Sequence, residues 1–179
     1  MLTKNIKFTN FRGNTNSSNK KKLAKILKNK NLVIEIPLLK SLSKDYQLSY
    51  SKKLVSSLKK FKKINLIGMG GSILGTQAIY DFLKDKITKK INFFDNLQSR
   101  EFNTNKEKNI NIIVSKSGNT LETITNHNLI SLKEKKNKNL FITESKDSFL
   151  TQLANKLKAE IIEHKNFIGG RYSVLSEVG

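Results

Sequence analysis

From residue 64 onward, short apolar runs alternate with amphipathic helical patterns. The apolar runs occupy residues 64–68, 91–95, 109–114, 139–143 and 160–164. Between them, apolar side chains recur at helical spacing; in residues 73–83, for example, Leu74, Ala78 and Phe82 share one face. Strands that alternate with amphipathic helices are typical of βαβ units and of a mostly parallel sheet. We therefore predict an α/β fold in which a doubly wound, Rossmann-like sheet lies between two layers of helices.

Residues 1–63 lack this alternation. Residues 1–18 are polar and rich in Asn and Ser, so we expect a loosely held arm there. Apolar residues at helical spacing within residues 23–27 and 46–61 predict helices, the second with lysines on its opposite face. We therefore expect an N-terminal arm and helical lead-in over residues 1–63, followed by one main domain over residues 64–179.

The chain has a large excess of basic side chains. It contains 34 Lys and Arg against 14 Asp and Glu, which gives a formal net charge of +20. Such a charge favours a polyanionic partner such as nucleic acid. However, only Arg12, Arg100 and Arg171 are arginines, and Arg is the residue whose planar fork suits nucleic-acid recognition. We interpret the scattered lysines as a Lys/Asn-biased composition and predict no nucleic-acid partner; a basic nucleic-acid binder is an alternative that only the charge favours.

Cysteine and long apolar runs are both absent from the sequence. The lack of cysteine excludes disulfides and thiolate metal sites. No apolar run approaches the ~18 residues that a membrane-spanning helix needs, and the N-terminal residues contain no continuous apolar core of a signal peptide. We expect a cytoplasmic protein with no membrane partner, no metal and no cofactor.

A glycine-rich turn, Gly68-Met69-Gly70-Gly71-Ser72, follows the first apolar run directly. Glycines let the chain turn sharply and let backbone N–H groups approach a ligand, and the helix that follows offers its N-terminal amides to an anion. Ser72 adds a hydroxyl donor. The dinucleotide fingerprint is an alternative, with Asp95 as its ribose-binding acid, but Ile73 stands where its third glycine belongs. A tight turn without a ligand is a second alternative.

A hydroxyl-rich loop, Ser115-Lys116-Ser117-Gly118-Asn119-Thr120, follows the run at residues 109–114 and leads into a helical pattern. Its hydroxyls, its lysine and the N-terminal amides of the helix form a dense array of donors that suits the acceptor oxygens and the charge of a phosphate. A cluster of helix-capping residues is the alternative. Because ligands bind at the carboxyl ends of parallel strands, we expect this serine loop and the glycine turn to act together.

The last motif, Gly169-Gly170-Arg171-Tyr172-Ser173, completes a pattern that resembles the glucose-6-phosphate isomerase family. That family has a Gly-x-Gly-Gly-Ser turn, a Ser-Lys-[Ser/Thr]-x-x-Thr-x-Glu-Thr loop and a Gly-Gly-Arg-[Phe/Tyr]-Ser signature, in this order. Here they stand at residues 68–75, 115–123 and 169–173. The resemblance covers residues 64–179, which it identifies as a sugar-isomerase (SIS) domain truncated at its C-terminal end. The serine loop is shared with the wider sugar-isomerase superfamily, whereas the arginine motif is specific to this family.

The resemblance implies an aldose–ketose isomerase that interconverts glucose 6-phosphate and fructose 6-phosphate through a cis-enediolate, in glycolysis and gluconeogenesis. Arg171 would stabilise the negative charge of that enediolate; a structural ion pair is the alternative role for it. The side chains at Ser72 and in the serine loop would hold the phosphate, with Lys116 lining the loop, and the glycines would let the sugar approach the backbone. These predicted substrate-binding residues are Gly70, Gly71, Ser72, Ser115, Lys116, Ser117, Thr120 and Gly170.

The general base and the ring-opening group of the family, a Glu, a His and a Lys, lie downstream of the arginine motif, and this sequence ends at Gly179. Neither His127 nor His164 has neighbours in the sequence that support a catalytic role. We therefore expect an N-terminal portion of the enzyme that has no turnover alone and forms a homodimer at full length. A non-catalytic sugar-phosphate-binding module and another sugar-phosphate isomerase remain alternatives.

Overall fold

The computed structural model describes residues 17–28, 36–97, 109–133 and 137–178. The chain divides into two compact units, Met1–Leu39 and Lys40–Gly179. In the first unit, α1 (Ser17–Leu27) confirms the helical pattern predicted there, whereas most of the predicted arm lies outside the described residues. The short 3-10 helix η1 (Pro37–Leu42) contains the point of division. The domain boundary predicted after residue 63 stays a prediction.

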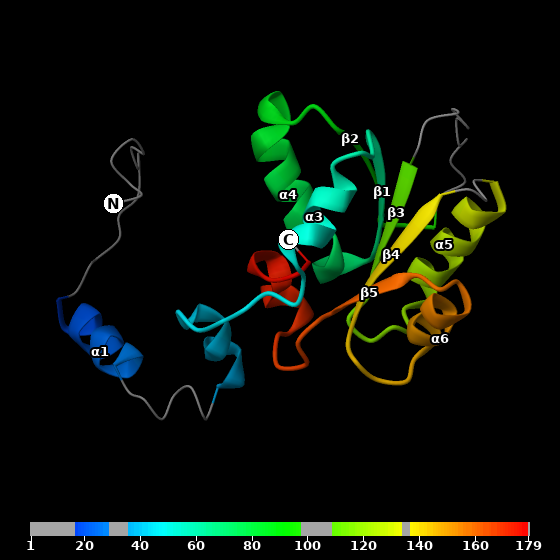
Figure 1. Cartoon of the computed structure of the whole chain (residues 1–179). Helices are drawn as coiled ribbons and strands as arrows, with labels where there is room; N and C mark the ends of the chain where they lie inside the picture. The colour runs from blue at the N-terminus through cyan, green and yellow to red at the C-terminus, as the bar shows by residue number, and fades with distance from the viewer. Residues whose placement is uncertain (1–16, 29–35, 98–108, 134–136, 179) are drawn as a thin grey trace. The chain divides into compact units, whose positions relative to one another are not determined.

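The second unit is built on a parallel five-stranded sheet with the strand order β2-β1-β3-β4-β5 (Figure 1). All neighbouring strands are parallel, and each apolar run predicted from the sequence overlaps its strand. The strands are β1 (Lys63–Ile67), β2 (Lys90–Phe94), β3 (Asn109–Val114), β4 (Lys138–Thr143) and β5 (Glu160–Glu163). The predicted α/β fold with a doubly wound parallel sheet is therefore confirmed.

Helices cover both faces of the sheet, with α3 and α4 on one side and α5 and α6 on the other (Figure 1). These helices are α3 (Lys52–Leu58), α4 (Leu74–Leu83), α5 (Leu121–Lys133) and α6 (Phe149–Lys156). Because successive side chains of a strand point to opposite faces, Leu66 packs in the core with Leu54 of α3, whereas Ile67 packs with Ile130 of α5 and Leu150 of α6. Burial on both faces explains why apolar residues follow one another in the strands instead of alternating with polar ones.

The helix predicted within residues 46–61 is shorter than its apolar pattern. It begins only after Ser51, whose Oγ accepts a hydrogen bond from the backbone N–H of Leu54 at 3.1 Å. Ser at this position satisfies an N–H group that the helix itself leaves unpaired, and so fixes the first turn. Phe61 lies beyond the helix but still packs in the core, so the apolar spacing reports burial there and not helix length.

A row of asparagines, one from each of four neighbouring strands, crosses the sheet. Asn92, Asn65, Asn111 and Asn139 stand at matching positions of β2, β1, β3 and β4. Asn92 Nδ2 donates to Asn65 Oδ1 and Asn65 Nδ2 donates to Asn111 Oδ1, both at 2.9 Å, and Asn111 Nδ2 donates to Asn139 Oδ1 at 3.0 Å. Asn65 and Asn111 are buried, so these hydrogen bonds replace the water that their amides lose on folding.

Strand order places two loops at a switch point of the sheet. β1 lies between β2 and β3, so the chain leaves β1 toward one edge and leaves β3 toward the other. In doubly wound sheets of this order, ligands bind in the crevice at the carboxyl ends of these two strands. The glycine turn follows β1 and the serine loop follows β3, as the prediction required.

Not every amphipathic face is covered in the second unit. The face of α4 that carries Leu74, Ala78 and Phe82 is exposed, with Phe82 87% accessible. The predicted spacing on this helix is therefore observed, but the stripe does not pack on the sheet. Among the described helices, none has the length and apolar character that crossing a bilayer requires.

Candidate functional site

The glycine turn after β1 is shaped by close backbone approaches. The short 3-10 helix η2 (Gly70–Ser72) forms it, and Gly70 has a φ of +54°, which side chains rarely adopt. A β-carbon on Gly68 would lie 3.2 Å from the carbonyl oxygen of Val114, at the end of β3. The turn therefore lies directly beside the strand that leads into the serine loop.

The arginine motif forms the 3-10 helix η4 (Gly170–Leu175), which packs on the glycine turn. Ser173 Oγ lies 3.1 Å from the carbonyl oxygen of Gly71 and 2.7 Å from that of Gly170, and its single hydrogen is shared between the two acceptors. A β-carbon on Gly71 would collide with the carbonyl group of Gly170 and lie 3.1 Å from the amide nitrogen of Arg171. Two motifs about 100 positions apart in the sequence are thus in backbone contact, which requires glycine at position 71.

Arg171 and Tyr172 lie on the outer side of η4 and are exposed. No carboxylate of the described residues forms an ion pair with Arg171, so within them the guanidinium is available to a ligand. The structural ion pair considered as an alternative role for Arg171 is not found among these residues. The neighbouring Ser173 is buried, so the motif has an anchoring side and an open side.

The hydroxyls of the serine loop converge. Ser115 Oγ lies 2.8 Å from Thr120 Oγ1, and Ser117 Oγ lies 3.5 Å from Ser115 Oγ and 3.4 Å from Thr120 Oγ1. Ser115 is buried and also accepts from the backbone N–H of Gly118 at 3.2 Å, whereas Ser117 is exposed. The cluster lies immediately before α5, whose N-terminus favours an anion. Ser115 thus accepts within the loop and not from the first turn of α5, and Ser117, whose Oγ accepts from the backbone N–H of Asn119 at 3.3 Å, remains exposed to a ligand.

The loop is held from behind by the start of α6. Gly118 has a φ of +70°, and a β-carbon on it would collide with the side chain of Ser148, the N-cap residue of α6. Asn119 Oδ1 accepts from the backbone N–H of Phe149 at 2.9 Å, and Gly118 O accepts from that of Leu150 at 3.0 Å. This support from Ser148 and the first residues of α6 was not predicted, because nothing in the local sequence links positions 30 residues apart.

Lys116 is engaged with protein groups. Its Nζ donates to the carbonyl oxygen of Asn166 at 2.9 Å and lies 3.3 Å from Glu144 Oε1. Burial alone would raise the pKa of Glu144, but the ammonium groups of Lys146 and Lys116 outweigh it and hold the pKa below its usual range. Lys116 thus joins the serine loop to the segment before the arginine motif. Glu144, at the end of β4, was missed from the sequence.

Both histidines are buried. His127 of α5 contacts the ring of Phe141 and lies 3.1 Å from Ser131 Oγ. His164 follows β5 and lies beside Glu177. Burial lowers the pKa of both imidazoles, so both are neutral near pH 7.

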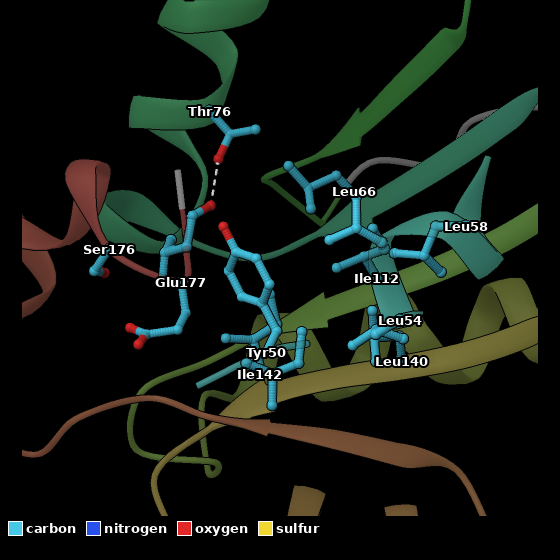
Figure 2. Close-up of a pocket in the computed structure, with 13 residues that line it drawn as sticks. Tyr50, Leu54, Leu58, Leu66, Thr76, Ile112, Leu140, Ile142, Ser176 and Glu177 are labelled. Carbon is cyan, nitrogen blue, oxygen red and sulfur yellow. Dashed lines mark hydrogen bonds between the residues drawn. The ribbon is translucent and has the colours of Figure 1, made fainter. Parts of the chain in front are cut away.

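A separate apolar pocket of about 200 Å³ lies between α3 and the sheet (Figure 2). Leu54, Leu66, Ile112 and Leu140 line its interior, and Tyr50 and Glu177 lie at its polar end. None of the predicted substrate-binding residues lines this pocket. Because its walls are core side chains with few hydrogen-bonding groups, it does not suit a phosphorylated sugar.

Structural comparison defines the class of the fold. A hypothetical protein from Thermus thermophilus aligns with a TM-score of 0.64 and 21% identity, over 91% of this chain and 41% of that one. Tagatose-6-phosphate ketose/aldose isomerase from Escherichia coli aligns with a TM-score of 0.55 and 18% identity, over 80% of this chain and 40% of that one. At these identities the likeness shows the fold alone. The second unit thus has the α/β fold of a phosphosugar isomerase domain.

Sequence comparison gives the family. The phosphoglucose isomerase family model matches residues 17–179. The glucose-6-phosphate isomerases of Campylobacter jejuni and Methanocaldococcus jannaschii are 35% and 37% identical to this chain, over 66% and 69% of it and 32% of each relative. The probable glucose-6-phosphate isomerase of Methanococcus maripaludis is 31% identical over 98% of this chain and 43% of that protein. The chain belongs to the phosphoglucose isomerase family and spans less than half the length of these relatives.

Proposed function

We propose that this chain supplies the sugar-phosphate-binding half of a glucose-6-phosphate isomerase. The observation that carries the proposal is the contact of the arginine motif with the glycine turn at the switch point, through Ser173 and Gly71. This contact fixes the backbone at Arg171, whose side chain is exposed, beside the turn that follows β1. Membership of the phosphoglucose isomerase family supports the reaction class proposed here.

The phosphate binds at the serine loop in this proposal. The exposed hydroxyl of Ser117 and the hydroxyl of Thr120 donate to its oxygens, Ser72 donates from the glycine turn, and the N-terminus of α5 favours its charge. Lys116 acts from the side, because its ammonium group already binds Glu144 and Asn166. Its positive charge contributes to the local field without a direct hydrogen bond to the ligand.

The sugar end extends toward Arg171. During isomerisation a proton moves between C1 and C2, and the intermediate cis-enediolate carries a negative charge on its oxygens. A guanidinium fixed beside those oxygens stabilises the charge, and such stabilisation is commonly the largest catalytic contribution. Both histidines are buried, and this proposal assigns the base and the ring-opening group to segments of a complete enzyme outside this chain. A full-length enzyme of this kind is a cytoplasmic homodimer in this proposal.

Calorimetric titration tests the proposal directly. We expect fructose 6-phosphate and glucose 6-phosphate to bind residues 1–179 weakly, and glucose without phosphate not to bind. Preference for a pentose or amino-sugar phosphate would favour another sugar-phosphate isomerase or a non-catalytic binding module. Tight, salt-sensitive binding of duplex DNA without any response to fructose 6-phosphate would reject the proposal. Conversion of glucose 6-phosphate by residues 1–179 alone would contradict the expected lack of turnover.

A further inference from the structure

Two buried ionisable side chains bracket the segment that carries Arg171. His164 follows β5 and is 1% exposed, and Glu177 follows η4 and is 5% exposed. Their side chains meet, with His164 Nδ1 3.9 Å from Glu177 Oε2. The intervening chain therefore forms a loop that is closed at its base by a histidine and a carboxylate. Neither residue belongs to the predicted substrate site.

Glu177 is anchored to a distant part of the second unit. Its Oε1 accepts from the hydroxyl of Tyr46 at 3.0 Å, from the backbone N–H of Ser49 at 3.1 Å and from the Ser49 hydroxyl at 3.2 Å. In Figure 2 the carboxylate points away from the apolar pocket residues Leu54 and Leu58. Burial, together with the hydrogen bond and the charge of Glu177, raises the pKa of Tyr46 to about 12. The C-terminal end of the loop is thus fixed by several donors.

His164 is satisfied on one side of its ring only. Its Nε2 lies 3.2 Å from the carbonyl oxygen of Ile168, which can only accept, so Nε2 carries the hydrogen. In the neutral ring Nδ1 then has a bare lone pair, and it has no hydrogen-bond partner within the described part of the chain. That lone pair faces the carboxylate of Glu177. In the neutral state, His164 Nδ1 and Glu177 Oε2 are both acceptors and cannot form a hydrogen bond with each other. A proton on Nδ1 makes it a donor, so the two side chains then attract each other.

We propose that His164 and Glu177 form a proton-operated clasp at the base of the Arg171 segment. When Nδ1 of His164 takes up a proton from water, the imidazolium and the carboxylate of Glu177 attract each other and the 3.9 Å contact shortens to a hydrogen bond. The contact at the base of the segment is then shorter, and the backbone around Arg171 responds to the protonation of His164. The clasp concerns the conformation of this segment and does not depend on which ligand it binds.

The surrounding groups set the pH at which the clasp closes. Burial lowers the pKa of His164, while the carbonyl of Ile168 raises it. The charges near the ring act in opposite senses: Glu177 and Glu144 raise the pKa and Lys116 lowers it. Tyr46, the remaining titratable neighbour of Glu177, has a pKa of about 12 and therefore stays neutral at every pH at which His164 titrates. The clasp therefore closes below pH 6.5, the ordinary pKa of histidine.

Nuclear magnetic resonance of uniformly ¹⁵N-labelled protein tests the clasp without any sugar. We expect the His164 ring to be the Nε2–H tautomer at about pH 7.5 and to gain a proton on Nδ1 as the pH falls. The backbone amides of Gly170, Arg171 and Tyr172 should titrate with the same midpoint. If the chain unfolds before His164 is protonated, or if these amides do not follow its midpoint, the clasp is rejected.

Glu177→Gln removes the carboxylate charge but keeps its shape. We expect the titration midpoint of His164 to fall by about 1 pH unit or more. The backbone amides of Gly170, Arg171 and Tyr172 should then no longer titrate with the midpoint of His164. His127, which lies on α5, is the internal control: its midpoint should be the same in both proteins. A His164 midpoint that is unchanged in the folded variant contradicts the clasp. Tyr46→Phe, which removes one donor to Glu177 and keeps its charge, provides a second variant that should retain the coupling if Glu177→Gln does not fold.

Discussion

Ser173 donates a hydrogen bond from Oγ to the carbonyl oxygen of Gly71 at 3.1 Å, and this bond ties the arginine motif to the turn after β1. The two residues are 102 positions apart. Their contact gives an exposed arginine a fixed place at the switch point of the sheet. The proposed function depends on this place more than on any single hydroxyl.

Gly71→Ala should disrupt the contact. The new β-carbon would collide with the backbone carbonyl of Gly170, and a backbone atom cannot move aside as the end of a side chain can. We expect a loss of about 1–3 kcal/mol in the free energy of unfolding, as is typical of overpacking, together with weaker binding of fructose 6-phosphate. Chemical denaturation and calorimetry measure the two effects.

Gly169→Ala is the matched control. Gly169 has a φ of −69°, which alanine adopts readily, and its new β-carbon would meet only the Tyr172 ring, at 3.5 Å. We expect its stability and its affinity to stay close to those of the unmodified chain. If Gly71→Ala has the same free energy of unfolding and the same affinity as Gly169→Ala, the contact between the two motifs contributes to neither stability nor binding.

Ser117→Ala should weaken phosphosugar binding without loss of stability. The side chain is exposed, and its hydrogen bonds within the loop are long, at 3.3, 3.4 and 3.5 Å. Loss of one hydrogen bond to a charged phosphate corresponds to about 1.5–3 kcal/mol, or roughly a 10- to 150-fold lower affinity. Ser145→Ala, in an exposed position after β4, is the control. Equal affinity in both variants would place the phosphate elsewhere.

Asn111→Ala should destabilise the sheet. Asn111 Oδ1 accepts from Asn65 and from Asn137, at 2.9 and 3.2 Å, and its Nδ2 donates to Asn139. Removing it leaves buried amides without partners, which costs about 1–3 kcal/mol for each unsatisfied group. Urea denaturation measures the change, with the exposed Asn155→Ala of α6 as control. A loss no larger than that of the control would mean that the asparagine row does not stabilise the sheet.

Stability should fall as the pH drops below 6.5, the ordinary pKa of histidine. Burial lowers the pKa of His127 in the folded chain, so the unfolded chain binds the proton first. The contribution of the neutral His127 ring to the free energy of unfolding is fully present above pH 6.5. It is lost as the pH falls toward the lower pKa that His127 has in the folded chain. The slope reaches at most about 1.4 kcal/mol per pH unit for one histidine. Thermal unfolding of His127→Gln should show a smaller slope than the unmodified chain, and an equal slope would contradict this assignment.

The sheet could be predicted from the sequence because a strand that is buried on both faces carries successive apolar residues. Leu66 and Ile67 pack on opposite faces, yet both are apolar. Apolar periodicity could not predict which helix faces are covered. Leu74 and Phe82 have the spacing of a packed stripe, but they are exposed, because coverage depends on what lies beside the helix.

The glycine, serine and arginine motifs could be predicted from the local sequence because turns and helix N-termini require particular residue types at neighbouring positions. The partners that hold them could not be predicted in this way. Glu177 binds Tyr46 across 131 positions, and Lys116 binds Asn166 across 50. Such pairs form only when the fold brings them together, so Glu144 carried no signal that distinguished it from surface acids.

The central claim is that the glycine turn, the serine loop and the arginine motif grip one phosphorylated sugar. Titration of ¹⁵N-labelled residues 1–179 with fructose 6-phosphate, followed by amide chemical shifts, tests it most directly. We predict that Ser72, Ser117, Thr120 and Arg171 respond together with a single dissociation constant. Shifts confined to one of the three segments, or different dissociation constants for Ser117 and Arg171, would contradict the claim.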